Sequence, residues 1–174
     1  MFIAHAPAGY LVSRMICRKL SLTANARNRM MASGIFGSIA PDFDLFYFYF
    51  IDNQQYDHHI YYTHYPIVWA CLMVVSIVSI VVFRKVISTY YLMVFSLCGF
   101  IHLLLDSVVG NIYWLAPFSD RAYALHGVVS YYTPWWLNFV LHWTFLFELI
   151  IVALALYINI NDRLPKMALN SAMK

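Results

Sequence analysis

The chain has 174 residues, of which 63% are hydrophobic and 11% are charged, with a mean hydropathy of +0.67 and a formal net charge of +3. Soluble domains have about 45–50% apolar and about 25% charged residues, and a chain of this size cannot hide so much apolar surface from water. This excludes an ordinary soluble enzyme, a disordered chain and a disulfide scaffold. The small charge, with no basic stripe, argues against a nucleic-acid partner. We expect one domain in contact with lipid.

Four apolar segments are expected to cross the membrane as helices, because each is close to the about 20 residues that a crossing needs. The first is interrupted by Pro41, Asp42 and Asp44, which predict a half-helix, a break and an aromatic segment. The second has no ionisable residue, and the third and fourth each contain one histidine and one acid. The candidate spans are residues 30–51, 66–83, 86–109 and 135–160. We therefore predict an all-α, integral membrane helical bundle over residues 1–174.

Basic residues mark one side of this arrangement. Five of them and no acid lie between Arg14 and Arg29, Arg84 and Lys85 form the turn between the second and third spans, and the C-terminal segment is also basic. With four crossings, every basic cluster falls on the same side, which the positive-inside rule places in the cytoplasm together with both termini. Aromatic residues gather near the opposite face as an interface belt. No removable signal peptide is expected, because no basic stretch precedes a long apolar run.

The third expected span contains a histidine and an aspartate four residues apart, in the segment GFIHLLLD. On a helix His102 and Asp106 share one face, so an imidazole nitrogen and a carboxylate oxygen can reach the same metal ion. The alternative is a hydrogen bond that satisfies both groups. Charged side chains within a span cost about 2.5–3.5 kcal/mol or more, so the pair is a candidate functional site.

Two further segments bring aspartate and histidine to about the same level. In PDFD, extended backbone would point Asp42 and Asp44 the same way, and carboxylates so close require a cation or a shared proton. Capping of a following helix explains one of them better than both. In DHHIYYTH, His59 and His64 lie before the second span and can converge from a turn, or simply form a polar loop. Nitrogen and oxygen donors suit Zn²⁺, Mn²⁺ or Fe²⁺, as one or two ions.

These motifs, in this order, resemble a family of inner-membrane-associated, metal-dependent hydrolases, one bacterial member of which is controlled by the LexA repressor. The family pattern has an N-terminal His near a Gly, then Pro-Asp-x-Asp, His-Arg-x-x-Thr-His and Gly-x-x-His-x-x-x-Asp. The corresponding segments are AHAPAG, PDFD, HIYYTH and GFIHLLLD, over about the first two-thirds of the chain. The resemblance implies that the metal ligands are His5, Asp42, Asp44, His59, His64, His102 and Asp106.

The resemblance also implies a membrane-bound hydrolase of the bacterial inner membrane. The family is distantly similar to zinc-dependent phospholipase C and P1 nucleases, which implies zinc and the hydrolysis of a phosphoester, with a membrane lipid or lipid-linked substrate. Ile60 replaces the arginine of the family motif, and this leaves substrate and activity open. His58 is an extra neighbour that could change which histidine binds. His5 fits only if residues 1–12 re-enter the membrane beside the site.

Metal-activated water is the expected nucleophile, because no G-x-S-x-G motif offers a serine. Asp42 or Asp44 would act as the catalytic base. His126 is a candidate further ligand, His142 could support the site from behind its ligands, and Glu148 is expected to be paired within the bundle.

Two other functions are open at this level. A non-enzymatic transporter or ion-handling protein would also carry His and Asp in its spans, but it needs polar groups from face to face. A haem protein with His102 and His142 as axial ligands would leave PDFD unexplained.

Overall fold

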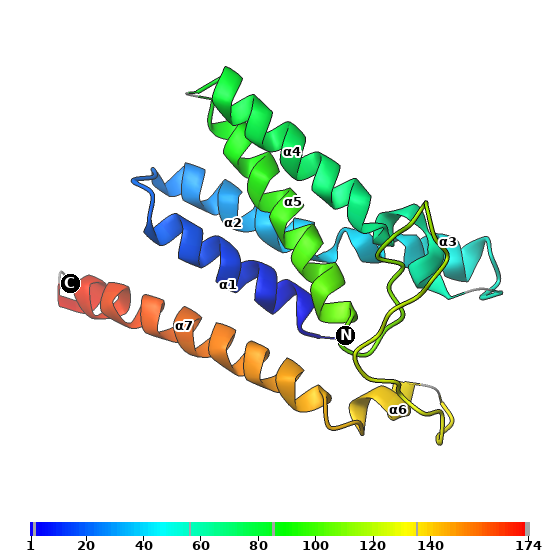
Figure 1. The fold of residues 1–174 in the computed structure, drawn as a ribbon. Coiled ribbons are helices and arrows are strands. Elements are labelled where there is room, and N and C mark those ends of the chain that lie inside the picture. The colour runs from blue at the N-terminus through cyan, green and yellow to red at the C-terminus, as the bar shows by residue number, and fades with distance from the viewer. Residues whose placement is uncertain (2, 56, 85, 135, 173–174) are drawn as a thin grey trace.

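The computed structural model is an all-helical bundle, as expected (Figure 1). It describes residues 1, 3–55, 57–84, 86–134 and 136–172, with side chains up to residue 162. Within this part of the chain no strand occurs, and the only β pairing is an isolated bridge between Ile112 and Tyr123. The α-helices are α1 (His5–Arg18), α2 (Ala24–Ile39), α3 (Asp44–Phe50), α4 (Pro66–Val82), α5 (Ile87–Asp106), α6 (Trp136–Val140) and α7 (Phe145–Ala172). Three short 3-10 turns are η1 (Pro41–Phe43), η2 (His58–Ile60) and η3 (Tyr62–His64).

The break expected in the first apolar segment is present. α2 begins after Thr23, whose hydroxyl caps it by accepting the Ala26 N–H at 3.3 Å. It ends at Ile39, and Pro41 starts η1, because proline has no N–H to continue the helical ladder. α3 follows directly, so Asp42 lies in η1 and Asp44 is the first residue of α3. The extended backbone expected for PDFD is wrong, because the 3-10 turn leads into the helix at once.

The number of membrane crossings differs from the expectation. Two described helices are long and apolar enough to cross a membrane, α5 and the Phe145–Asp162 part of α7. α4 is apolar but has 17 residues, and residues 30–51 are divided among α2, η1 and α3. The segment 135–160 is divided as well, because residues 141–144 form a turn between α6 and α7. The expected start of that segment, Trp135, lies outside the described residues.

Small residues let the helices approach one another closely. A Cβ atom on Gly37 of α2 would lie 2.2 Å from the carbonyl oxygen of Phe95 in α5. A Cβ on Gly99 of α5 would lie 2.1 Å from the ring of Trp69 in α4. In a membrane, such close contact between backbones is a main source of helix association, since lipid is as apolar as the side chains. The positions of α2, α4 and α5 therefore depend on these glycines.

The bundle has two chemically different ends. The α1–α2 turn, the α4–α5 turn and the end of α7 lie together at one end, which carries the basic segments, whereas α3, α6 and residues 107–134 lie at the other (Figure 1). At the basic end Asp162 of α7 accepts from Arg14 of α1 at 2.5 Å. The basic residues Lys85 and Lys174 lie outside the described residues, as do the side chains of Arg163 and Lys166.

Met1 and the described end of α7, at Ala172, lie at opposite ends of the bundle (Figure 1). The expectation that both termini share the cytoplasmic side is therefore not confirmed. The physical reason is α1, which runs beside α2 and α5 from the end that carries α3 to the basic end.

Replacement of Gly37 by alanine is expected to destabilise the bundle by about 1–3 kcal/mol, because the new Cβ would overlap the backbone of Phe95, which cannot rotate away. The measurement is thermal unfolding of the detergent-purified protein. Gly127→Ala is the matched control, since nothing lies within 4 Å of a Cβ at that position. Equal unfolding midpoints for the two variants would contradict the proposed close contact of α2 and α5.

Candidate metal centre

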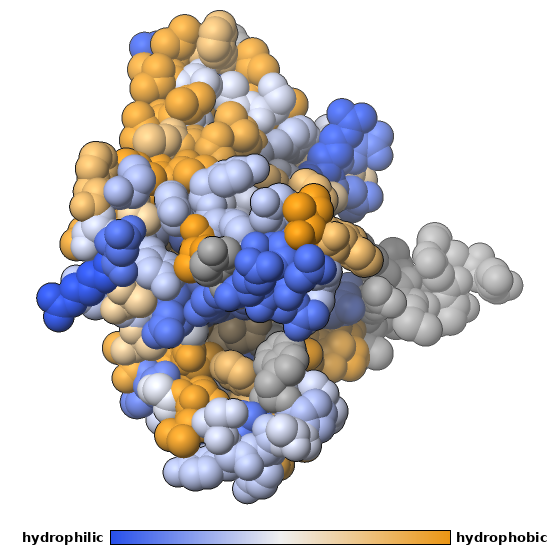
Figure 2. All heavy atoms as spheres, turned by 90° about the vertical axis from the view of Figure 1, so that its right-hand side faces the viewer, coloured by the Kyte–Doolittle hydropathy of each residue, from blue (hydrophilic) through white to orange (hydrophobic). Residues whose placement is uncertain are grey.

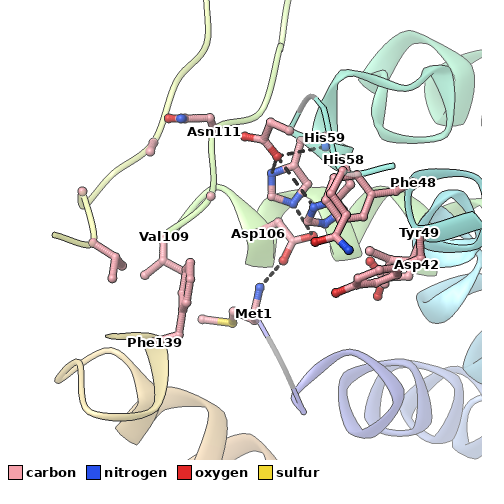
Figure 3. Close-up of a pocket in the computed structure, with 17 residues that line it drawn as sticks. Met1, Asp42, Phe48, Tyr49, His58, His59, Asp106, Val109, Asn111 and Phe139 are labelled. Atoms are coloured by element: carbon pink, nitrogen blue, oxygen red, sulfur yellow. Dashed lines mark hydrogen bonds and ion pairs between the residues drawn. The ribbon is translucent and has the colours of Figure 1, made fainter. Parts of the chain in front are cut away.

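Asp106, in the last turn of α5, is the centre of a cluster of histidines and is only 2% exposed. Its Oδ2 lies 2.8 Å from His102 Nε2 and 3.8 Å from the Nε2 atoms of His64 and His59. Its Oδ1 lies 3.1 Å from His5 Nε2 and also contacts the backbone amino group of Met1 (Figure 3). One buried carboxylate thus meets groups from α1, α5 and the η2–η3 loop.

His102 is held with its Nε2 toward this centre. Its Nδ1 lies 2.7 Å from the carbonyl oxygen of Ser38, which can only accept, so Nδ1 carries a proton. In the neutral imidazole Nε2 is then an acceptor, yet it lies next to another acceptor, Asp106, without the geometry of a hydrogen bond. Two buried acceptors so close require a cation between them, either a second proton on the ring or a metal ion.

His64 is held in the same way by Asp44. The Oδ2 of Asp44 lies 2.5 Å from His64 Nδ1 and accepts the Thr63 hydroxyl at 2.6 Å. His64 Nε2 is buried without a hydrogen-bond partner, 3.8 Å from both Asp42 Oδ1 and Asp106 Oδ2. A carboxylate that binds the far nitrogen of a histidine is the usual support of a metal ligand, since it fixes the tautomer and the ring orientation. The structure therefore places Asp44 behind the centre, and Asp42 in it.

Four side chains converge closely enough to hold one ion. Each offers a ligand atom, and these atoms lie within 4.8 Å of one another. The group consists of Asp42, His64, His102 and Asp106. Two oxygen and two nitrogen donors match the ligands and the number that zinc prefers.

A second group of possible ligands overlaps the first. It consists of His58, His59 and His64, again with ligand atoms within 4.8 Å. Asp57 lies beside it, with its Oδ1 3.5 Å from His59 Nδ1. His5 is the remaining neighbour, since its ring stacks on His102 at 3.7 Å and its Nδ1 is buried without a partner.

The histidines of the η2–η3 loop are in the form that binds metal. Burial lowers the pKa of His59 to about 3, although the nearby Asp106 opposes the shift. Burial also lowers the pKa of His64 to about 4, and His102 adds to the effect. Both rings are therefore neutral at pH 7, which leaves a lone pair on each for an ion.

A pocket of about 680 Å³ opens directly onto this centre. In Figure 3, Asp106 lies between Val109 and Phe139 on one side and Phe48 and Tyr49 on the other. The described part of the chain contributes no lysine or arginine side chain to its wall, and Ile60 does not line it. The pocket therefore combines carboxylates and imidazoles with an apolar wall.

The structure brings all seven sequence-predicted ligands to one place, but in different roles. Four form the first group, His5 and His59 contact Asp106, and Asp44 lies behind His64. Two other predicted candidates lie outside both groups within the described chain. His126 packs on Trp143 at 4.9 Å, and His142 hydrogen-bonds Thr144 at 2.8 Å.

The contact that holds Ile3 beside the site has no local signal in the sequence. Glu148 of α7 accepts the Ile3 N–H at 2.6 Å, which fixes the chain just before His5. The sequence predicts that Glu148 has a partner within the bundle but not which residue it is, because a contact between residues 145 positions apart leaves no local pattern. The sequence also assigns no firm role to His58 and Asp57, although both line the pocket.

The comparison with known families gives one result. A sequence model of the YdjM inner membrane protein family matches residues 1–164. No curated protein and no solved structure matches the chain. The family match covers the centre, α1 to α6, and α7 up to residue 164.

We expect His59 and His64 to remain neutral between pH 5 and pH 8 in metal-free protein, because burial keeps their pKa values below that range. Nitrogen-15 NMR of histidine-labelled protein in detergent measures this directly, and His59→Gln and His64→Gln assign the signals. Protonation of either ring near pH 6.5 would show that water reaches that ring. It would contradict the burial of His59 and His64 in the structure.

Proposed function

The chain belongs to the YdjM inner membrane protein family, and on that premise we propose that it is a membrane-embedded, metal-dependent hydrolase of phosphoesters. The observation that carries the proposal is the Nε2 atom of His102, held 2.8 Å from Asp106 Oδ2, where either a second ring proton or a metal ion is required. A divalent ion would bind both atoms, and it would also reach the unpartnered Nε2 of His64. The order of the His and Asp motifs, which resembles that of a metal-dependent hydrolase family, favours the reaction class.

We propose zinc as the ion, with manganese or iron as the other candidates, held by Asp42, His64, His102 and Asp106. A divalent ion there supplies Lewis acidity toward a phosphoryl oxygen and a water molecule. The residues of the second group lie close enough to contribute to a second ion. Asp44 and the Ser38 carbonyl orient the two ligand rings from behind, so the site is built before anything binds.

Asp42 is the better candidate for the base. Both Asp42 and Asp44 were expected to be able to take the proton, but Asp44 is 6% exposed and its Oδ2 already meets His64 and Thr63. Asp42 lines the pocket and is partly exposed, so a substrate can approach its carboxylate. A base needs to reach the proton that it removes, and this favours Asp42.

The pocket supports a lipid or lipid-linked substrate. Its wall includes Leu45, Phe48 and Phe139, which suit an apolar group, and the carboxylates and imidazoles at its base suit a phosphoester only with a cation present. Because no lysine or arginine side chain of the described chain lines it, the ion would also have to bind the phosphate.

We propose that the basic end of the bundle faces the cytoplasm and that the site faces the outer side. The gathering of the basic turns at one end of the structure supports this through the positive-inside rule. α2 with α3, α4, α5 and α7 would then be the four membrane segments, α2 and α3 being joined at the Pro41 break.

Elemental analysis of detergent-purified protein is expected to find zinc, manganese or iron near one or two equivalents. Asp106→Asn and His102→Gln should lose it, whereas Asp44→Asn should bind it about 10–100-fold more weakly, since only the support of His64 is lost. His126→Gln is the matched control, because His126 lies outside both ligand groups. Protein that stays metal-free after reloading would refute the proposal.

Asp42→Asn, reloaded with excess metal, is expected to lower kcat for a phosphoester substrate by roughly 10²–10⁴, as loss of a general base does. The variant should keep a KM close to that of the wild type, whereas loss of the fold would remove metal and substrate binding together. A metal-loaded wild type that hydrolyses no phosphoester would instead favour the ion-handling alternative.

A further inference from the structure

The short helix α3 separates the pocket from the outside of the molecule. The residues on one of its faces line the pocket, and they are Leu45, Phe48 and Tyr49. Phe46 and Phe50 are four residues apart, so they share the other face, together with Phe43 just before the helix. These three rings are 44–79% exposed. α3 is therefore apolar on both sides, although only one side is covered by the protein.

The exposed rings form a continuous strip with the bundle, which we call the phenylalanine strip. It consists of Phe36, Phe43, Phe46 and Phe50, with successive ring centroids 5.3, 6.4 and 6.4 Å apart. Its inner end, Phe36 of α2, lies 5.9 Å from Phe95 of α5, a candidate membrane span. The strip thus extends the side of a candidate span past the Pro41 break and along α3.

The composition of the strip indicates what covers it. Soluble monomers rarely expose a large contiguous apolar patch. Tyrosine and tryptophan suit the membrane–water interface because they carry a polar atom, but phenylalanine has none. On α3 the tyrosine Tyr47 points elsewhere, edge-on to Tyr61 of the loop at 5.2 Å. The exposed strip therefore contains only rings without a polar atom, whereas Tyr47 and Tyr49 lie on the other sides of α3.

The length of the segment places the strip at membrane depth. Arg29 is the last basic residue of α2, and the chain from Met30 to Phe50 rises at most about 30 Å at helical pitch, the thickness of the hydrocarbon core, because the Pro41 break shortens the rise. Phe46 then lies within about 24 Å of the basic side, and Phe50 lies no further than the far boundary. Figure 2 views this end of the molecule and shows a hydrophilic patch with apolar side chains above and below it.

We propose that the phenylalanine strip lies against the acyl chains of the membrane lipids, so that α3 is a thin wall between the bilayer and the pocket. The pocket then opens at the level where lipid head groups begin. This surface does not depend on the hydrolytic reaction, and its test is independent of any activity or bound metal.

Site-directed spin labelling in lipid vesicles tests the proposal. The labels are attached at Phe46→Cys and Phe50→Cys in a Cys71→Ser background, because Cys71 is exposed whereas Cys17 and Cys98 are buried. Collision rates with oxygen, which concentrates in lipid, are compared with those of a water-soluble nickel chelate. Gln55→Cys is the matched control, since it is exposed and lies in the polar loop five residues after Phe50.

The expected result is an oxygen-to-nickel collision ratio several-fold higher at positions 46 and 50 than at 55, and higher at 46 than at 50. Ratios equal to that of position 55 would place the strip in water. Low access to both reagents would place it against protein, for example a second copy of the chain. Either result overturns the proposal. Phe50 is 79% exposed and ends α3, so its label decides the question if Phe46→Cys fails to fold.

Discussion

The rest of the structure depends on one buried carboxylate, Asp106. A charge with 2% exposure costs several kcal/mol unless opposite charge and hydrogen bonds compensate it, and the cost rises further in a lipid environment. The amino group of Met1 contacts its Oδ1, and the rings of His102 and His5 lie 2.8 and 3.1 Å from its oxygens. The neutral rings of His64 and His59 lie 3.8 Å away, in the η2–η3 loop. His5 is the first residue of α1 and His102 lies near the end of α5, so Asp106 is surrounded by groups from helix ends and a loop.

The distance between α2 and α5 connects helix packing to the chemistry of the site. Gly37 lets the two backbones touch, and the next residue, Ser38, presents its carbonyl oxygen to His102 Nδ1 at 2.7 Å. A larger residue at position 37 would push that oxygen away and free the ring to change tautomer. The small residues that associate the helices in lipid therefore also set the orientation of a candidate ligand.

The Pro41 break has a similar double role. It ends α2 at the depth where Asp42 can approach His102 Nε2, at 3.5 Å, and it starts α3, whose Asp44 supports His64. It also redirects the chain so that α3 presents one face to the pocket and leaves the phenylalanine strip on the other. The candidate ligands and the phenylalanine strip thus lie on opposite faces of one short helix.

The sequence by itself determined the helical class, the lipid environment, the break at Pro41 and the identity of the clustered residues, because composition, helical periodicity and short spacings are local properties. It did not determine the number of apolar helices long enough to cross, since turns such as residues 141–144 shorten an apolar run without changing its hydropathy. Only the tertiary structure showed that Asp42 lies in the cluster and that Asp44 lies behind His64. It also showed that Glu148 accepts the Ile3 N–H. Those distinctions rest on which atoms of distant segments meet, and no local spacing in the chain encodes them.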